Sequence, residues 1–529
     1  MKIASVVHNS VRKDARVIKE AVSLDRAGHT VMVYGISDTD KPESFTLPGS
    51  SVTVKLAAKA AAARTVKTNL FASPWVRRPI VAAFCMGVLT ALAVTAYPLT
   101  RQLSIHPDGT LNQAHHVTSQ MLLITNVILL ALLFRQRLQK HMIRPMIGLI
   151  RWIVEKTLRL YWHVVVRQFP SSVLAGQFAM RSLNLNFVRI LDPLRASLLQ
   201  DGAPDAVHLH DTVALLLAGD IKQHFGCPIV WDAHEIYEDM AGANDLRGLL
   251  NGCVIRHQAE FVDRFITIND SIKTFYAVNH KSLPPATVLM NATDRVVPPA
   301  YDGRLHQAAG LPPGQRIILF QGGFGAWRGL HALVEASREF APDWTLVLMG
   351  WGALESELMT LASSAPRPGA VPNVVFLPGV PHRELQEWSA GASIGAITYE
   401  NTSLNHLYCT PNKLWEYPSA GVPILATDLE ELGMAIRAHK IGFLLPRDFS
   451  ARHIAEAVNS LSAEALAAAQ DACRVFLTAN NWSLYEAQLQ DLYRRLESGP
   501  RPNRKPAVAR TEASNQLTAD GLRHTLVRP

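Results

Sequence analysis

Residues 409–428 read CTPNKLWEYPSAGVPILATD, and this stretch joins a helical pattern to an apolar run typical of a buried strand. Pro411 suits the start of a helix, and Lys413 and Glu416 follow it three residues apart. Side chains with this spacing share a helix face, with a rise of about 4.5 Å between them. A lysine can neutralise phosphate and a carboxylate can accept hydrogen bonds from vicinal hydroxyls, so the pair fits the diphosphate and ribose of one nucleotide. The alternative is an exposed helix turn with a weak charge pair.

Apolar runs that alternate with helical patterns extend from this stretch over most of the chain. In the first half, an apolar run at residues 3–7 precedes a helical pattern from Asp14 to Gly28 and a second strand pattern. Alternation of strand and helix is typical of parallel sheets, and a Pro-rich connection separates two such series. We therefore expect an α/β protein with two Rossmann-like domains that face a cleft. The runs of the second series are RIILFQGG, TLVLMGWG, VVFLPGV, SIGAITY, PILATD and GFLLP.

Residues 64–185 are typical of a membrane insertion within the first of these domains. Residues 79–99 and 117–134 carry no charge, and about 20 apolar residues span a bilayer as a helix. Lys and Arg residues flank the outer ends of this pair, which predicts a transmembrane hairpin with both ends in the cytoplasm. Residues 135–167 interleave basic and apolar side chains and fit amphipathic helices on anionic inner-membrane lipid. The alternatives are a pair of buried core helices and a core helix with a solvated basic side.

The composition sets further limits. The chain has 529 residues, a formal net charge of +8 and 48% apolar residues, and its length favours two or three domains. Its five cysteines show no CxxC spacing, so we expect reduced thiols and no zinc site. No apolar segment follows the first charges, which argues against a signal peptide. We expect a multi-pass protein of the cell inner membrane, with its α/β domains in the cytoplasm and no nucleic-acid partner.

Two glycines and an arginine follow one of the predicted strands. In open α/β sheets, ligands bind at the carboxyl ends of the strands. Gly322 and Gly323 stand at such an end and would let a phosphate approach the backbone, while Arg328 precedes the next helical pattern and would add a charged contact.

Two histidines with acidic neighbours follow strands of the first half. His210 precedes Asp211, and His234 precedes Glu235. Each histidine is a candidate for the ligand edge of the sheet, and the alternative is a hydrogen-bonded core residue. His234 and Glu238 have the spacing of metal ligands on a helix, but no third ligand is evident, so we expect no metal site.

The order and spacing of several motifs resemble those of GT-B glycosyltransferases, specifically family 4, the glycosyl transferases group 1. In the second half these motifs are QGGFGAWRGLHALVEA, LVLMGWG, VVFLPGVPHRELQEWSAGA and PNKLWEYPSAGVPILATD. In the first half they are RVIKEAVSLDRAGHTVMVYG, HLHD and WDAHE. The resemblance implies a first domain that binds the acceptor, a second domain that binds a nucleotide-sugar donor, and no bound metal or other cofactor.

The resemblance also implies roles for individual residues. Glu416 would hold the ribose of the donor. Lys413 and Arg328 would face its diphosphate, and His234 would lie at the transferred sugar; these three are the expected catalytic residues. Further donor-binding residues would be Gly322, Gly323, Asn412 and Pro411, with His210, Asp211 and Glu235 on the acceptor or sugar side.

Two positions depart from the family pattern. Tyr408 stands where the family often has a glutamate, eight positions before Glu416. Gly323 stands where the family has an arginine, five positions before Arg328. Both departures lie beside the donor motifs, so contacts to the donor phosphates would be rearranged.

We expect a membrane-anchored, retaining glycosyltransferase of hexosyltransferase type. It would move a sugar from a nucleotide sugar to a lipid-linked or saccharide acceptor in polysaccharide or glycolipid synthesis. The rivals are a sugar-nucleotide epimerase and a non-catalytic GT-B scaffold in a membrane assembly. The expected boundaries are residues 1–63 and 186–297 for the acceptor domain, 64–185 for the membrane insertion, 298–480 for the donor domain, 481–498 for a helix that crosses back to the first domain, and 499–529 for a disordered tail.

Overall fold

The computed structural model describes residues 1–59, 173–243, 245–364 and 371–499. The residues before 61 and after 168 belong to one compact unit. Among the described residues, no helix is both long enough and apolar enough to cross a bilayer. The expected spans at 79–99 and 117–134, the basic segment 135–167 and the tail after residue 499 all lie outside the described residues.

The N-terminal domain is built on a mostly parallel sheet. Its strand order is β3-β4-β2-β1-β5-β6-β7-β8, and only β3 and β4 pair antiparallel. The strands are β1 (Lys2–Val6), β2 (Thr30–Ile36), β3 (Glu43–Thr46), β4 (Thr53–Ala57), β5 (Ala206–His210), β6 (Ile229–Ala233), β7 (Arg264–Thr267) and β8 (Ala286–Val288).

Helices connect these strands and cover the sheet. Helix α1 begins where the Asp14 carboxylate accepts a hydrogen bond from the backbone N–H of Val17, and its apolar face packs on the sheet. Helix α7 crosses residue 186, where the sequence suggested that the domain resumes, because it packs against β2, β4 and α10. The helices are α1 (Ala15–Arg26), α7 (Val173–Gln200), α8 (Asp211–Leu215), α9 (Ala218–Phe225), α10 (Asp245–Gln258) and α11 (Asp270–Asn279).

The C-terminal domain contains a second sheet, in which every pair of neighbouring strands is parallel. Its order is β11-β10-β9-β12-β13-β14, which is the order of a doubly wound Rossmann fold. The predicted α/β fold with parallel sheets is therefore confirmed. The strands are β9 (Arg316–Gly323), β10 (Trp344–Trp351), β11 (Val374–Pro378), β12 (Ile394–Ile397), β13 (Ile424–Thr427) and β14 (Gly442–Leu445).

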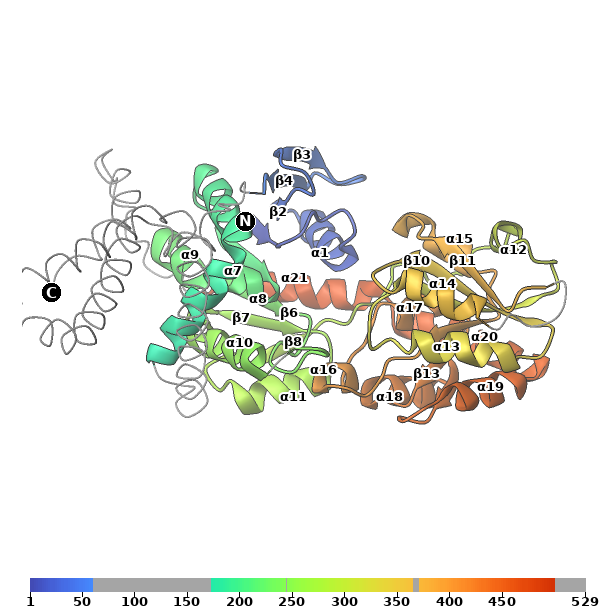
Figure 1. The fold of residues 1–529 in the computed structure, drawn as a ribbon. Coiled ribbons are helices and arrows are strands. Elements are labelled where there is room, and N and C mark those ends of the chain that lie inside the picture. Colours follow the sequence, from blue (N-terminus) through green and yellow to red (C-terminus); the bar gives the residue numbers. More distant parts are fainter. Residues whose placement is uncertain (60–172, 244, 365–370, 500–529) are drawn as a thin grey trace, which may run out of the picture. The chain divides into compact units, whose positions relative to one another are not determined.

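Helices cover both faces of this second sheet, and this explains why its strands are continuous apolar runs. Ile317 and Leu319 of β9 pack into one core cluster, and Ile318 and Phe320 pack into the other. Figure 1 shows the helices around these strands in yellow to red. They are α12 (Arg304–Ala309), α13 (Leu330–Ala336), α14 (Glu355–Ser363), α15 (Leu385–Ser389), α16 (Leu404–Leu407), α17 (Lys413–Ser419), α18 (Glu430–His439), α19 (Ala451–Asn459) and α20 (Ala463–Ala479).

The last described helix, α21 (Trp482–Ser498), packs on the N-terminal domain rather than on the domain that precedes it in the chain. Figure 1 shows it in red among the N-terminal elements. Trp482, Leu489 and Tyr493 belong to the core cluster of β1 and α1, and the Trp482 indole donates a hydrogen bond to Ser23 Oγ at 2.8 Å. Helix α21 thus packs against the first strand and the first helix of the chain.

Each sheet has one point where the strand order reverses direction. In the N-terminal sheet this point lies between β1 and β5, and in the C-terminal sheet it lies between β9 and β12. Loops diverge there at the carboxyl ends of the strands and leave a crevice, which is where such sheets bind ligands. The candidate site residues are found beside these two points.

Candidate functional site

A cleft of about 1330 Å³ contains most of the predicted site residues. Residues from both Rossmann-like domains line it. The predicted residues among its lining are His234, Glu235, Gly322, Arg328, Pro411, Asn412, Lys413 and Glu416. Gly323, His210 and Asp211 are not in the lining, but they neighbour the lining residues Arg328 and His234.

Lys413 and Glu416 form the first turn of α17. The backbone carbonyl of Asn412 accepts a hydrogen bond from the N–H of Glu416 at 2.9 Å, which starts the helix. Lys413 is only 7% exposed, and the side chain of Glu416 is 13% exposed. The pair is therefore not the exposed, weak charge pair that was the alternative interpretation of this stretch.

Tyr417 anchors α17 against the ends of β9 and β12. Its hydroxyl donates to the carbonyl of Leu319 at 2.8 Å and accepts from the N–H of Gln321 at 3.3 Å. Its ring lies so close to Gly395 that a Cβ there would approach the ring to 2.4 Å, so only glycine fits. The helix ends at Ser419, one residue after Pro418, which cannot donate a backbone hydrogen bond.

The Glu416 carboxylate has one oxygen bound inside the protein and one toward an exposed histidine. Gln321 Nε2 donates to Glu416 Oε2 at 2.9 Å, and Ser389 Oγ donates to Gln321 Oε1 at 2.6 Å. The other oxygen, Oε1, lies 3.4 Å from Nε2 of the half-exposed His382. Burial raises the pKa of Glu416, but the contact with His382 and the charge of Lys413 outweigh it and lower the pKa overall. Glu416 is therefore ionised at neutral pH.

Lys413 places its ammonium group over Gly322 and between two aromatic rings. A Cβ at Gly322, whose φ is +112°, would lie 3.4 Å from Lys413 Nζ. The ammonium lies 5.2 Å from the centre of the Phe320 ring and 5.8 Å from that of Tyr399. Within the described parts of the chain, no carboxylate lies within ion-pair distance of Lys413. A nearly buried cation with no carboxylate at ion-pair distance is suited to bind an anionic ligand.

Arg328 shares the Tyr399 ring with Lys413. Its guanidinium lies 5.7 Å from the ring centre and donates to the carbonyl of Gly323 at 3.0 Å. The carbonyl of Arg328 itself accepts a hydrogen bond from Thr398 Oγ1 at 2.9 Å. Tyr399 was not predicted from the sequence, although it ends the run SIGAITY at the carboxyl end of β12.

The two departures from the family pattern have structural roles of their own. Gly323 supplies the carbonyl that holds Arg328. The carbonyl of Tyr408 accepts a hydrogen bond from Asn269 Nδ2 at 2.7 Å, so this loop is attached to the N-terminal domain.

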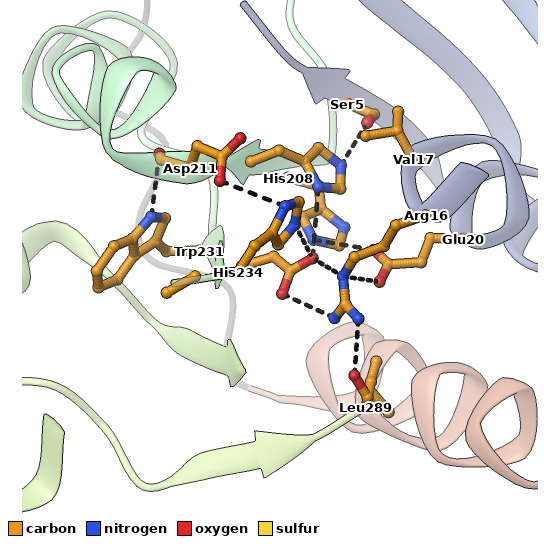
Figure 2. A network of polar contacts seen from close by, with 12 residues as sticks. Ser5, Arg16, Val17, Glu20, His208, Asp211, Trp231, His234 and Leu289 are labelled. Carbon is orange, nitrogen blue, oxygen red and sulfur yellow. Dashed lines mark hydrogen bonds and ion pairs between the residues drawn. The ribbon is translucent and has the colours of Figure 1, made fainter. Parts of the chain in front are cut away.

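The N-terminal domain contains a network of polar side chains that includes Arg16 and His234 (Figure 2), and both contact the carboxylate of Asp232. Arg16 holds this buried carboxylate with two hydrogen bonds, from Nε at 2.7 Å and from a terminal nitrogen at 2.9 Å. His234 Nε2 lies 2.8 Å from Asp232 Oδ2, and His210 Nδ1 lies 3.4 Å from the same oxygen. Burial raises the pKa of Asp232, but Arg16 and His234 lower it well below the ordinary value, so Asp232 is an anion.

His234 also contacts Asp211. Its Nδ1 lies 3.3 Å from Asp211 Oδ1, which accepts a further hydrogen bond from the Tyr237 hydroxyl. Asp211 has a φ of +64°, which is costly for a residue with a side chain. Such strain is typical of functional sites.

Behind this layer lie three buried side chains, His208, His210 and Glu20. His210 is fully buried and Nε2 contacts Ser5 Oγ at 3.0 Å, so it does not reach the cleft where the sequence placed it. His208 Nε2 lies 3.5 Å from Glu20 Oε2. With Asp232 these residues have the composition of a metal site, but Arg16 lies against both carboxylates and supplies a cation already.

Sequence reasoning missed Arg16 and Asp232. Both stand in the motifs RVIKEAVSLDRAGHTVMVYG and WDAHE, which were used only for their order. The signal was available, because a charged residue inside an otherwise apolar strand, such as Asp232, needs a partner when the strand is buried.

Comparisons with known proteins agree with this geometry. Residues 315–464 match the family model described as glycosyl transferases group 1. A search of curated proteins finds no match. Sucrose-phosphate synthase from Thermosynechococcus elongatus is a similar solved structure, with 13% identity and a TM-score of 0.56 over 94% of this chain and 99% of that one. An α,α-trehalose-phosphate synthase (UDP-forming) from Burkholderia vietnamiensis has 11% identity and a TM-score of 0.53 over 94% of this chain and 99% of that one.

At these identities the solved structures establish the fold, and the family model establishes the nature of the C-terminal domain. Residues 315–464 therefore match a glycosyl transferases group 1 domain, and this agrees with the resemblance of the motifs in this half of the chain to those of GT-B glycosyltransferases.

Proposed function

We propose that the chain is a retaining glycosyltransferase that takes a sugar from a nucleotide sugar bound to its C-terminal domain. One observation carries the proposal: Lys413 and Arg328 share an aromatic support beside the ionised Glu416, and Lys413 has no carboxylate partner among the described residues. A diphosphate would supply the missing anion, and the ribose hydroxyls would donate to Glu416. The trehalose-phosphate synthase of similar fold is described as UDP-forming, which is the same leaving group.

The proposed reaction is attack on the face from which the diphosphate leaves. The acceptor oxygen forms a bond to the anomeric carbon, the bond from that carbon to the diphosphate breaks, and a phosphate oxygen takes the proton of the acceptor. Negative charge grows on the diphosphate in the transition state, and Lys413 and Arg328 stabilise it there. In this proposal these two cations, and no resident metal ion, meet that charge.

The proposal also includes a membrane location and a lipid-linked acceptor. It rests on the uncharged stretches 79–99 and 117–134 and on the basic segment 135–167. A hairpin of this kind would hold the cleft close to the inner membrane, where a lipid-linked substrate of polysaccharide or glycolipid synthesis is presented. A reporter fused within residues 105–115 should map outside the cytoplasm; a cytoplasmic reporter would reject the hairpin.

Release of free nucleoside diphosphate tests the reaction. The purified full chain is given a panel of sugar nucleotides, with and without membrane lipid extract. We expect release with one donor that depends on the extract. Release without any acceptor, together with an altered sugar nucleotide, would identify an epimerase. No release with any donor under either condition would identify a non-catalytic scaffold.

A further inference from the structure

His234 lies between two carboxylates, one at each nitrogen of its ring. Nε2 is 2.8 Å from Asp232 Oδ2, and Nδ1 is 3.3 Å from Asp211 Oδ1 (Figure 2). A neutral imidazole has one N–H and one acceptor nitrogen, so one of these contacts would set two acceptors against each other. The imidazolium, with an N–H at each nitrogen, donates to Asp232 and carries a positive charge that Asp211 attracts.

The two carboxylates are themselves fixed in place. Asp232 is fully buried and receives two hydrogen bonds from Arg16. Arg16 is held at its other end by the carbonyl of Leu289 at 2.7 Å, so the guanidinium cannot turn away. Asp211 receives the Tyr237 hydroxyl, and its backbone carbonyl accepts from the Trp231 indole at 3.2 Å. The carboxylates therefore stay aimed at the ring of His234.

The charges around His234 favour its protonated form. Burial lowers the pKa of His234, but Asp211 and Asp232 outweigh burial and raise it to about 10. The opposing charge is the guanidinium of Arg16. The ring of His210 also lies near, with its centre 5.6 Å away. The other titratable groups around the ring are Asp14 and Glu20 on or before α1, His8 after β1, His208 on β5, and Glu235 and Tyr237 after β6.

We propose that Asp211 and Asp232 keep His234 an imidazolium ion in the wall of the cleft, and that Arg16 is a positioning residue that fixes Asp232. His234 then presents a fixed positive charge to the substrate and cannot take a proton from the acceptor. Its charge state follows from the contacts within the N-terminal domain, while its part in sugar transfer rests on the proposed function.

The charge state can be measured on the wild-type protein. The full chain is labelled with ¹³Cε1-histidine and titrated from pH 6 to pH 10, and the signal of His234 is identified by its loss in His234→Gln. We expect this signal to titrate at least one pH unit above the ordinary histidine value of about 6.5. A midpoint at or below the ordinary value would overturn the proposal.

Asp232→Asn tests the origin of the charge, because it keeps the shape of the side chain and removes its charge. We expect the His234 midpoint to fall by at least one pH unit. Asp220→Asn is the matched control, since Asp220 is an exposed residue on α9 that pairs with Arg195, and it should leave the midpoint unchanged. If Asp232→Asn does not fold, Asp211→Asn tests the other nitrogen. An unchanged midpoint in the folded variant would reject the role of the carboxylates.

The pH profile of kcat/KM tests the role in the reaction. Above the lowered midpoint of Asp232→Asn, the protonated fraction of His234 falls about tenfold per pH unit, so activity should fall with it relative to wild type. A base would give the reverse, with activity that rises as the ring loses its proton, and this result would overturn the proposal. If the titration is as expected but wild type releases no nucleoside diphosphate from any donor, the charge assignment stands and the proposed function fails.

Discussion

The two domains that line the cleft differ in whether their charged side chains are paired. In the N-terminal domain, Arg16, Asp232 and His234 hold one another at hydrogen-bond distance. In the C-terminal domain, Lys413 lies beside two aromatic rings, and no carboxylate of the described residues lies within ion-pair distance of it. Both groups stand beside the point where the strand order of a sheet reverses.

The charged groups of the N-terminal network are held by protein partners, whereas Lys413 in the C-terminal domain is suited to bind an anionic ligand. The ion pairs of the N-terminal network hold their members in place, and two of them act on His234. A cation supported by an aromatic face keeps its charge, because the ring supplies only a weak quadrupole attraction. The fold therefore sets the position of each charged group, and the groups in contact with it set its charge state and the ligands that it can bind.

The largest effect is expected from breaking the paired side. Arg16→Met leaves Asp232 buried with only the histidines near it, and removing one partner of a buried pair costs about 3–5 kcal/mol of unfolding free energy. Urea unfolding followed by circular dichroism measures this loss. Arg452→Met, which breaks an exposed pair with Glu456 on α19, is the control and should leave the midpoint unchanged. A change of equal size in both variants would show that the burial of the network has no energetic weight.

Lys413→Ala should have the largest effect on the reaction. Loss of one group that stabilises transition-state charge lowers kcat by roughly 100- to 1000-fold. Donor KM should change less, because the charge on the diphosphate grows during transfer. Steady-state rates of nucleoside diphosphate release give both values, with Arg474→Gln on the exposed face of α20 as control. A folded Lys413→Ala variant with wild-type kcat would contradict the donor-site assignment.

Glu416→Gln should act on donor affinity. It removes a charged acceptor, and a hydrogen bond to a charged group is worth about 1.5–3 kcal/mol, so donor KM should rise roughly ten- to a hundred-fold. The melting temperature measured alongside shows whether the variant remains folded. Equal donor KM values for a folded variant and wild type would mean that Glu416 does not hold the ribose.

The unfolding free energy should depend on pH through His234 and the two carboxylates that contact it. The pKa of His234 is raised to about 10 in the folded protein, so its contribution is complete below the unfolded value of about 6.5 and is lost as the pH rises through the folded value. The unfolding free energy should therefore decline between these limits more steeply in wild type than in His234→Gln. One titrating group gives at most about 1.4 kcal/mol per pH unit. Parallel curves for the two proteins would contradict the raised pKa.

The smallest effect is expected from replacing Tyr399, the aromatic ring beside Lys413 and Arg328. Tyr399→Leu removes a ring that faces two cations, and each such contact is worth about 0.5–1 kcal/mol at a partly hydrated site. Affinity for the nucleoside diphosphate whose release is observed, measured by calorimetry, should fall several-fold, and Tyr399→Phe should restore it because the ring is kept. Equal losses in both variants would assign the effect to the hydroxyl instead.

Much of the fold could be predicted from the sequence, because it depends on local periodicity. The alternation of apolar runs and helical patterns predicted two α/β domains, and both sheets follow it. Gly322 and Gly323 at a strand end, and Lys413 and Glu416 on one helix face, were predicted as donor-site residues, and of these four all but Gly323 line the cleft. Each of these features is set within a few residues of chain.

The site could be predicted only in part. His210 was expected at the ligand edge, but it is buried, and its ring contacts Ser5 and Asp232 inside the domain. Tyr399 was not expected, because its two cations come from other loops and only the folded chain brings them to one ring.

The sequence by itself determined which segments form strands and helices and which polar residues end them. Only the tertiary structure decided which charges are paired. Arg16 and Asp232 are 216 positions apart in the chain, and nothing in the spacing of either residue indicates the other. Lys413 has aromatic rings beside it and no carboxylate at ion-pair distance among the described residues for the same reason: ion pairs depend on distances of a few ångströms, and packing of the whole domain sets those distances.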